Sequence, residues 1–372
     1  IVIFKGVEAM QKKSEAFPKK IYLKPALEER LAQILAVPLT VAAAPFGYGK
    51  TTAVKKVLLS LSVDMLWDTC YSGAEAAFWR CFVKSLQTVG VDTASLTWQE
   101  LPRNAATRQR VIEVLQVSKL KKTVVFVWNN YHLLGSEDCD KLLLALAKAD
   151  LPGWHFVLLT QRPPDFTLDE LVLKGECLYL QAKDFAFEVS DIIVYYRKNG
   201  IVLERRAAEN LLAATEGWVS ALYLYLRQYH NGQSPQTDEE LLRLVQAVAY
   251  NSCSEAEKTL LTELSILNED FSGRQAAYIT ENDAAPALLE NLALRHGFIS
   301  YELLRGQYHI HNAFKVYLQR RGAELPDTEL RRLCRRGGQW YELQNDFLAA
   351  FCYYHTAGDY DKMLTVFEKD RG

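Results

Sequence analysis

The segment at residues 44–51 constrains the fold of this chain more than any other, because it joins two patterns that belong to one structural unit. A short apolar run at 38–43 precedes it and is typical of a buried strand. A helical pattern follows it from residue 50 to about residue 61. The sequence therefore predicts a strand, a glycine turn and a helix in immediate succession. The first turn of such a helix presents free backbone N–H groups to an anion.

Two glycines, a lysine and a threonine give this turn a specific chemistry. Gly47 and Gly49 allow the backbone to bend so that its N–H groups point at phosphate oxygens. Lys50 is placed to reach the β- and γ-phosphates, and Thr51 offers a hydroxyl to Mg²⁺. The segment matches the Walker A pattern with an alanine at the first glycine position, and it predicts binding of ATP or ADP. The residues expected to contact the nucleotide here are Phe46, Gly47, Tyr48, Gly49, Lys50, Thr51 and Thr52.

Apolar runs alternate with helical patterns up to about residue 183. Runs at 65–70, 123–128 and 155–160 predict buried parallel strands, and 177–180 is a candidate for a fifth. Helical patterns lie at 25–36, 75–89, 108–115 and 138–149. The alternation predicts an α/β P-loop domain with a parallel sheet and helices on both faces.

After residue 184 the pattern becomes mainly helical. Helices are expected at 188–198, 204–215 and 220–228, and a polar stretch at 231–238 is expected to be a linker. Ser254 and Glu257 form a capping-box signature that opens a helix expected at 254–267. Candidate strands at 298–303 and 307–311 suggest that a winged-helix domain follows. Helices at 330–343, 347–357 and 360–368 predict the start of a helical-repeat array similar to tetratricopeptide repeats. The expected division is a lead-in at 1–20, a nucleotide-binding domain at 21–183, a helical lid at 184–238, a winged helix at 239–325 and a repeat arm at 326–372.

Composition excludes several classes of function. The formal net charge of −2 gives the chain no overall basic field for nucleic acid. Its seven widely spaced cysteines include no C-x-x-C pair, which argues against a zinc site and for reduced thiols in a cytoplasmic protein. The sequence contains no apolar stretch of the roughly 18 residues that would span a membrane, so no membrane partner is expected.

The acidic half of an ATPase site is missing at its expected place. A strand at 123–128 should end in an aspartate that holds magnesium, but Asn129 and Asn130 follow it. An amide supplies neither negative charge nor a useful general base at neutral pH. Asp138 and Asp140 lie further along the chain and are expected on a surface helix face. Hydrolysis is therefore expected to be very slow or absent, and the Mg²⁺ site at Thr51 to be weakened.

Taken in order, these segments resemble the regulatory STAND ATPases of the MalT type, the large ATP-binding transcription regulators of the LuxR family. Residues 44–52 are similar to their A-P-A-G-Y-G-K-T-T loop, 78–80 to F-W-R-Y, and 127–132 to V-I-D-D-Y-H with both aspartates replaced. Segments 21–31, 159–164, 217–222 and 308–314 resemble the family's opening, phosphate-sensor, lid and winged-helix motifs, and 340–359 its first repeats. The sensor register places Gln161 at the family's arginine and Arg162 one step later. The resemblance implies further nucleotide-contacting residues: Ile21, Lys24, Arg162, Gly217, Trp218 and His311.

The resemblance also implies a switch. ADP would hold the nucleotide domain, lid and winged helix closed, and an unknown small-molecule or protein inducer together with ATP would open them and permit self-association. DNA would be bound only through a C-terminal domain that lies outside these 372 residues, which we expect to be the N-terminal part of a longer protein. Two alternatives stay open at this point. One is an active ATPase with a non-standard acid, and the other is a pseudo-ATPase scaffold that acts through protein contacts.

Overall fold

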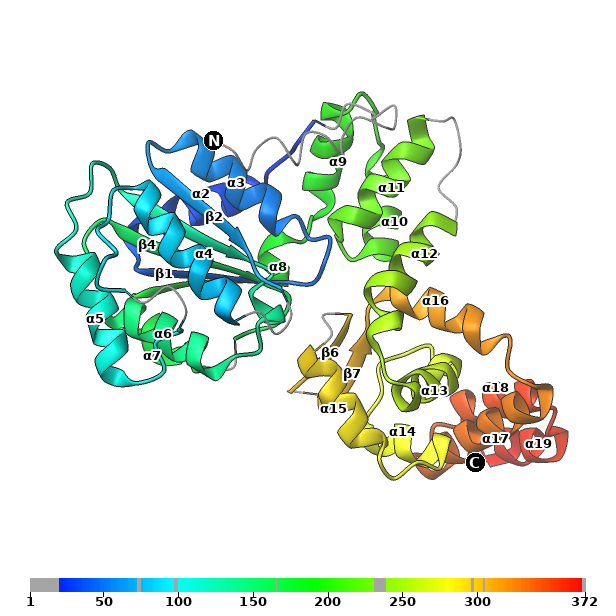
Figure 1. Cartoon of the computed structure of the whole chain (residues 1–372). Helices are drawn as coiled ribbons and strands as arrows, with labels where there is room; N and C mark the ends of the chain where they lie inside the picture. The colour runs from blue at the N-terminus through cyan, green and yellow to red at the C-terminus, as the bar shows by residue number, and fades with distance from the viewer. Residues whose placement is uncertain are drawn as a thin grey trace.

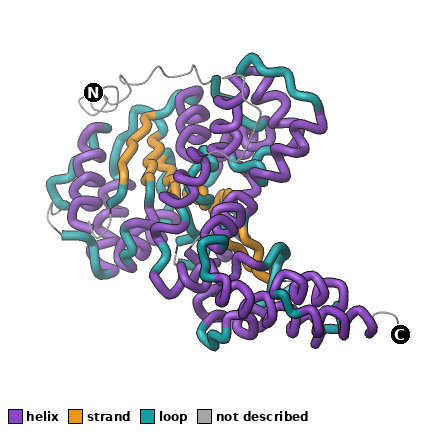
Figure 2. The backbone as a smooth tube through the Cα atoms, turned by 90° about the vertical axis from the view of Figure 1, so that its right-hand side faces the viewer, coloured by secondary structure: helices purple, strands orange, loops and turns teal. Residues whose placement is uncertain are grey.

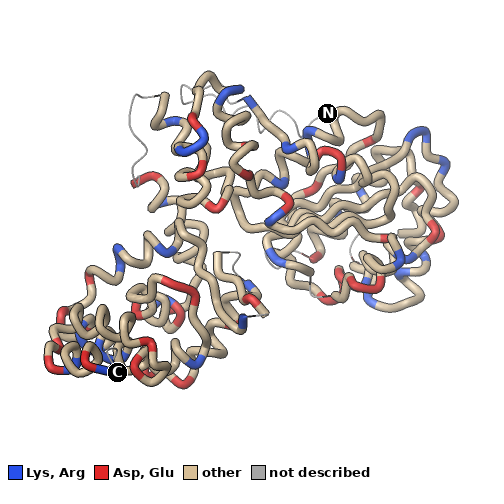
Figure 3. The backbone as a smooth tube through the Cα atoms, turned by 180° about the vertical axis from the view of Figure 1, so that it is seen from behind, with Lys and Arg blue, Asp and Glu red and all other residues tan. Residues whose placement is uncertain are grey.

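The computed structural model describes residues 20–71, 75–96, 100–164, 166–230, 239–295, 298–303 and 305–369. Apart from Lys20, the expected lead-in lies outside the described residues, and so does the whole of the expected linker at 231–238. Along the chain, a sheet flanked by helices is followed by a helical region, a second helical region with a hairpin, and three C-terminal helices (Figure 1). Acidic and basic residues are interspersed along the backbone (Figure 3). In the part of the chain that the structure describes, no helix is both long and apolar enough to cross a membrane.

The first region is built on a five-stranded parallel sheet with the strand order β2-β3-β4-β1-β5. All five expected strands are present within about one residue of the predicted limits, which confirms the predicted α/β class. The strands are β1 (Leu39–Ala43), β2 (Asp64–Thr69), β3 (Val124–Asn129), β4 (Trp154–Thr160) and β5 (Cys177–Gln181). Because β4 lies between β1 and β3, the carboxyl ends of these three strands meet at one edge of the sheet.

Helices cover both faces of this sheet. On one face lie α2 (Pro25–Ala32), the short 3₁₀ helix η1 (Gln33–Ala36) and α3 (Lys50–Ser60), and on the other lie α4 (Glu75–Thr88), α5 (Ala105–Gln116), α6 (Glu137–Lys148) and α7 (Asp169–Leu173). The side-chain period of two in β3 sends Val125 and Val127 to the first core, and Phe126 and Trp128 to the second. The same alternation directs Asn129, at the end of β3, toward the face that carries α3. The helix expected at 25–36 is in fact α-helical only to Ala32 and then tightens into η1.

Four helices form the region that we call the lid. They are α8 (Ala182–Phe185), α9 (Val189–Lys198), α10 (Arg205–Thr215) and α11 (Val219–His230). The lid shares one continuous apolar core with the α2–α3 face of the sheet domain. The loop between β1 and α3, which lies on that face, is therefore packed directly against the lid.

In the described residues after the lid, the structure has five α-helices, two short 3₁₀ helices and a hairpin. The elements are α12 (Glu239–Val248), η3 (Tyr250–Ser252), α13 (Glu255–Glu263), η4 (Leu264–Ile266), α14 (Gly273–Thr280), α15 (Ala285–Arg295), β6 (Ile299–Glu302), β7 (Gln307–Ile310) and α16 (Asn312–Gly322). The hairpin β6-β7 is antiparallel, with Ile299 opposite Ile310. The predicted capping box is present, since the Ser254 hydroxyl accepts from the Glu257 N–H at 3.3 Å and the Glu257 carboxylate accepts from the Ser254 N–H at 2.8 Å. The helix expected at 254–267 is shorter than predicted: it ends at Glu263 and continues as η4.

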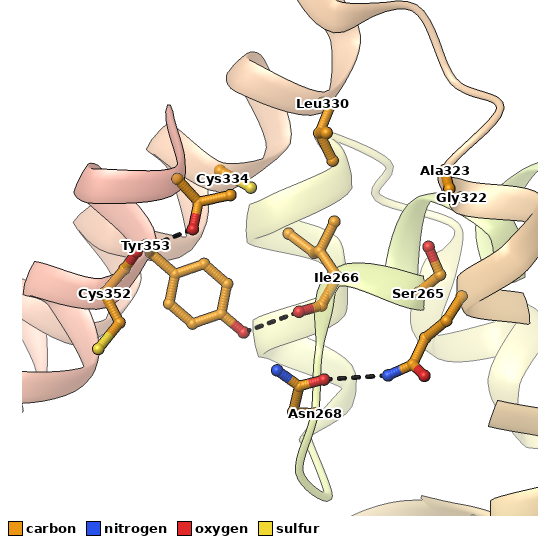
Figure 4. A pocket seen from close by; sticks show the side chains of 11 residues that line it. Ser265, Ile266, Asn268, Gly322, Ala323, Leu330, Cys334, Cys352 and Tyr353 are labelled. Carbon is orange, nitrogen blue, oxygen red and sulfur yellow. Dashed lines mark hydrogen bonds between the residues drawn. The ribbon is translucent and has the colours of Figure 1, made fainter. Parts of the chain in front are cut away.

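The C-terminal helices form the region that we call the arm. They are α17 (Asp327–Leu343), α18 (Phe347–Ala357) and α19 (Tyr360–Lys369), and they extend from the winged-helix region toward the C-terminus (Figure 2). Helices α17 and α18 approach closely because Gly337 and Gly338 face the rings of Tyr353 and Tyr354, and a Cβ atom on either glycine would lie 2.8 Å from a ring carbon. At the junction with the preceding region, the Tyr353 hydroxyl donates to the Ile266 carbonyl at 3.2 Å (Figure 4).

Candidate nucleotide site

The loop between β1 and α3 has the backbone that an anion-binding turn requires. Gly47 and Gly49 have φ values of +83° and +84°, a region that side chains with a Cβ atom rarely adopt. Gly49 is the N-cap of α3, and its carbonyl accepts the Ala53 N–H at 2.9 Å. The free N–H groups at the start of an 11-residue helix therefore open onto the loop. This geometry fits a phosphate group.

Lys50 supplies a cation at the same place. Its Nζ donates to the carbonyl oxygens of Ala44 and, at 2.9 Å, of Pro45, both in the loop itself. Burial lowers the pKa of Lys50 to about 8, because the low-polarity surroundings disfavour its charged form. A phosphate beside Nζ would supply the opposite charge that the ammonium lacks, so this residue also fits an anionic ligand.

A pocket of about 360 Å³ extends from this loop to an aromatic end. The loop end is lined by Phe46–Ala53, Asn129, Asn130, Gln161 and Ser220. The N-terminal segment, α2 and the lid contribute Ile21, Tyr22, Leu23, Leu27, Phe185, Phe187, Tyr195 and Val219. A polar, cationic end and an apolar, aromatic end suit a phosphate chain and a base, respectively. The structure thus brings Ile21 and all seven predicted loop residues to one pocket.

The aromatic end was not predicted from the sequence. Phe185, Phe187 and Tyr195 lie more than 130 residues after the loop, and they reach the pocket because β5 and α8 lead the chain back beside β1. The rings of Phe187 and Tyr195 meet edge to face at 5.5 Å, and those of Tyr22 and Phe187 at 5.4 Å. The signal available in the sequence was the pair Phe185 and Phe187, which follows the strand predicted at 177–180. It did not indicate that these rings would line a pocket with the loop.

Asn129, at the end of β3, lies beside the threonine of the loop. The Thr51 hydroxyl donates to the Asn129 side-chain oxygen at 3.2 Å, so a neutral amide stands where a carboxylate would face a metal ion. Asn130 has φ +58°, a left-handed conformation that asparagine tolerates better than most residues. Asp140 accepts the Tyr131 hydroxyl at 2.5 Å, and Asp138 is 3.4 Å from Arg103. Both of these acids are therefore engaged around α6 and not at Thr51.

Arg162 lies in a separate recess, next to the pocket. Gln161 lines the main pocket, whereas Arg162 lines a small adjoining recess with His132. The Gln161 N–H donates to Nδ1 of His132 at 3.3 Å. Burial, followed by the nearby charges of Lys50 and Arg162, lowers the pKa of His132 to about 4. This histidine is hence neutral at physiological pH, and it links the end of β3 to the segment that follows β4.

Lys24 lies outside the described lining of the pocket and instead ties the N-terminal segment to the lid. Its buried Nζ donates to the Ala186 carbonyl at 2.7 Å and lies 3.6 Å from both Glu188 and Asp191. The Tyr22 hydroxyl donates to Asp191 at 2.8 Å. The geometry therefore gives Lys24 an indirect place at the site, where it positions the segment that lines the aromatic end.

Trp218 and Ser220 hold the lid against the loop. The indole Nε1 of Trp218 donates to the Phe46 carbonyl at 2.9 Å, and both the N–H and the hydroxyl of Ser220 donate to the Gly47 carbonyl at 3.1 Å. A Cβ atom on Gly47 would lie 2.5 Å from both Nε1 of Trp218 and Oγ of Ser220. Gly47 is thus required for the lid contact as well as for the turn. Trp218 is fully buried, and it touches the loop through the backbone of Phe46.

His311 is buried behind Trp218. Their ring centroids are 5.9 Å apart, and Nδ1 of His311 accepts the Ala313 N–H at 3.2 Å at the start of α16. Its Nε2 lies 4.0 Å from a Glu216 carboxylate oxygen and has no hydrogen-bond partner among the described residues. His311 does not appear in the described lining of the pocket, and its contact with a phosphate stays a prediction.

Gly217 is placed where no side chain fits. Its φ is +75°, and a Cβ atom would lie 2.3 Å from the carbonyl oxygen of Phe187. We expect Gly217→Ala to lower the free energy of unfolding by about 2–4 kcal/mol, because the backbone strain and the clash add. The control is Gly90→Ala, where φ is +84° but open space surrounds the position. Chemical denaturation of the two variants measures the difference, and equal losses of stability would show that the contact with Phe187 is unimportant.

A second pocket, at the junction with the arm, has a different character. It measures about 380 Å³ and is lined by Ser265, Ile266, Asn268, Gln319, Gly322, Ala323, Leu330, Cys334, Cys352, Tyr353 and Thr356 (Figure 4). None of these described lining residues is charged. A phosphate would find no cation there, so the loop pocket is the better nucleotide site. Among the described residues, no group of three or more histidine, cysteine, aspartate or glutamate side chains could hold a metal ion by itself.

Comparison with known proteins agrees with this geometry. Residues 247–330 match the family model of the MalT winged helix domain. The Walker-type ATPase of Pyrococcus abyssi is 14% identical with a TM-score of 0.58, and the alignment covers 83% of this chain and 99% of that one. A STAND protein with a tetratricopeptide repeat sensor from Pyrococcus horikoshii is 16% identical with a TM-score of 0.46. The alignment covers 96% of this chain and 52% of that one, so this chain spans about half the length of that relative. No curated protein sequence matches the chain.

The match at 247–330 confirms the predicted winged-helix domain, and the similarity to the Walker-type ATPase confirms the fold that surrounds the loop. The chain therefore has the fold of a P-loop ATPase and carries a winged-helix domain similar to that of MalT.

Proposed function

We propose that this chain is the nucleotide-controlled switch module of a MalT-type transcription regulator, which binds ATP or ADP at the loop pocket and hydrolyses ATP very slowly or not at all. The observation that carries the proposal is the contact between Thr51 and Asn129 at 3.2 Å, beside a complete phosphate loop. The loop retains what binding requires. The neighbouring strand lacks the carboxylate that would hold Mg²⁺ firmly and the base that would activate water.

The remaining parts of the proposal extend beyond this pocket. We assign nucleotide binding to residues 21–183, the lid to 184–238, the winged helix to 239–325 and the start of a sensor arm to 326–372. We further propose self-association on activation, an unknown inducer and DNA contact outside these residues, and the similarity of residues 247–330 to the MalT winged helix domain supports this part of the proposal. The seven free thiols support a reducing, cytoplasmic setting.

The proposal is tested by denaturing the purified chain and identifying the nucleotide that it releases, and by titrating the stripped chain with ATP and ADP. Bound or titratable adenine nucleotide is the expected result. The complete absence of both would favour a scaffold with an empty loop. A separate assay of phosphate release is expected to give at most a few turnovers per hour, and a rate of about 1 s⁻¹ or above, typical of active enzymes, would favour a true ATPase.

The pKa of Lys50 adds a pH dependence. In the free protein this amine titrates at about 8, below its ordinary value of 10.5, because of burial. A bound phosphate stabilises the charged form, so we expect the affinity for ADP to be constant below pH 7 and to weaken as pH rises through 8, by up to tenfold per pH unit. Titration calorimetry between pH 6.5 and 9.5 measures the effect. A constant Kd across this range would contradict the role of Lys50 as the phosphate-binding cation.

A further inference from the structure

The turn between α10 and α11 contacts two other parts of the molecule at once. On one side, Trp218 and Ser220 donate to the carbonyls of Phe46 and Gly47 in the phosphate loop. On the other side, Glu216 faces the junction of β7 and α16 in the winged-helix region. Because Glu216 and Trp218 are only two residues apart, a displacement of the loop cannot be taken up by a long flexible segment between them.

Glu216 makes a set of polar contacts that we call the clamp, formed by Glu216, Asn312, His309 and Asp270. One carboxylate oxygen of Glu216 accepts the backbone N–H of Asn312 at 2.7 Å. The other lies 3.2 Å from Nε2 of His309, whose Nδ1 is 2.8 Å from Asp270. The Asn312 side chain in turn donates to the Ala213 carbonyl of α10 at 2.8 Å. The clamp thus joins the lid to the winged-helix region from both directions.

The charges in the clamp are complementary. Hydrogen bonds to Glu216 and then Asp270 raise the pKa of His309 to about 9, so this imidazole is cationic at neutral pH between two carboxylates. The Glu216 carboxylate also lies at the N-terminus of α16, an 11-residue helix whose positive end favours an anion. The attraction between Glu216 and the β7–α16 junction is therefore both ionic and hydrogen-bonded.

Two observations connect Glu216 to the phosphate loop specifically. Its backbone has φ +48°, a strained conformation for glutamate, and it is followed directly by Gly217, which has no room for a side chain. The turn is therefore held in one shape by its surroundings. In addition, after burial, the charge of Glu216 raises the pKa of Tyr48, which is a residue of the loop. The negative charge of the Glu216 carboxylate therefore acts on Tyr48, a residue that lines the nucleotide site.

We propose that Glu216 is a positioning residue that couples the phosphate loop to the winged-helix domain. The clamp holds the winged helix on the lid while the loop keeps the Trp218–Ser220 contacts, and nucleotide at the loop controls how often the clamp opens. This inference rests on the proposed nucleotide binding. It assigns the coupling to the carboxylate of Glu216, which makes the hydrogen bonds of the clamp two residues before Trp218.

The test is hydrogen exchange of the Asn312 amide, the donor to Glu216, in the full chain with and without ADP. In the unmodified protein we expect ADP to increase the protection of this amide at least about fivefold, the lower end of typical coupling between sites. In Glu216→Gln, which keeps the shape of the side chain and removes its charge, we expect an ADP effect below about twofold. Coupling between two sites is reciprocal. Glu216→Gln should therefore raise the Kd for ADP by no more than the factor by which it reduces the ADP-dependent protection of the Asn312 amide.

The matched control is Glu209→Gln on the same helix, whose exposed carboxylate pairs with Arg205 at 2.8 Å and which should respond to ADP like the unmodified protein. If Glu216→Gln does not fold, Asp270→Asn replaces it, because Asp270 touches His309 and not the lid; a reduced response to ADP is then expected. If ADP protects the Asn312 amide in the folded variant as strongly as it does in the unmodified protein, the inference is overturned. ADP binding without any change at Asn312 in the unmodified protein also overturns it, whereas absence of ADP binding overturns the proposed function and this inference together.

Discussion

Replacement of Lys50 by alanine is expected to weaken binding of ADP by about 100-fold, which is the loss that follows from removing a charged hydrogen-bond donor from a phosphate. The amine is already partly desolvated in the free protein and lies within hydrogen-bond distance of two loop carbonyls. Its removal should leave the fold intact, because the loop is also held by the backbone contacts of Ser220 to Gly47. Equilibrium titration with ADP measures the change.

The control for this experiment is Lys56→Ala. Lys56 lies on the same helix, α3, and is not among the described residues that line the nucleotide pocket. It should bind ADP within about twofold of the unmodified chain, since a distant surface charge contributes little. Equal affinities for the unmodified chain and Lys50→Ala would mean that the nucleotide, if it binds, does so elsewhere.

Restoration of the missing acids is expected to have the second large effect. In the double substitution Asn129→Asp and Asn130→Asp, a carboxylate would face Thr51 across the present distance of 3.2 Å, and a second would follow at the end of β3. We expect ATP turnover to rise at least about tenfold, because a placed general base alone contributes about 10²–10⁴-fold and the new site will be imperfectly arranged. The affinity for Mg²⁺ in the presence of ADP should also increase, since a carboxylate is a better ligand than an amide.

Each single substitution separates the two roles. Asn129→Asp places a carboxylate at the hydroxyl of Thr51, so it should raise the affinity for Mg²⁺ more than Asn130→Asp does. The gain in ATP turnover should require both substitutions. Measurements of phosphate release and of Mg²⁺ titration with bound ADP distinguish these effects. Unchanged turnover in a double variant that still binds ATP would show that the asparagines are not what limits hydrolysis.

The fold of the first region was largely predictable because its three central strands, β1, β3 and β4, are buried on both faces. Such strands form short continuous apolar runs, so β1, β3 and β4 appeared within about one residue of their predicted limits. The capping box at Ser254 was predictable for a related reason, since both partners lie within one helical turn. The helix α12 was not predicted, although its apolar residues, among them Leu241, Leu242 and Val245, recur at helical spacing. The one-turn helix α8 is too short to show any period.

The phosphate end of the site was predictable from local sequence, because a glycine turn before a helix determines where N–H groups point. The contacts that close the site were not. Lys24 meets Ala186 and Asp191 across more than 160 residues, and Glu216 meets His309 across 93. Pairings of this kind depend on how the lid folds back on the loop, and a single sequence contains no local pattern that specifies them. The family resemblance placed Lys24, Trp218 and His311 at the nucleotide, whereas the structure shows Lys24 and Trp218 in contacts between the lid and the N-terminal part of the chain, and His311 buried behind Trp218.

The central claim is that this chain binds a nucleotide through the loop at Gly47–Thr51. The most direct test is calorimetric titration of the nucleotide-stripped chain with ADP. One saturable site per chain is predicted, with an affinity that is lost in Lys50→Ala and retained in Lys56→Ala. Absence of binding by the stripped, folded chain, or binding that is unchanged in Lys50→Ala, would contradict the claim.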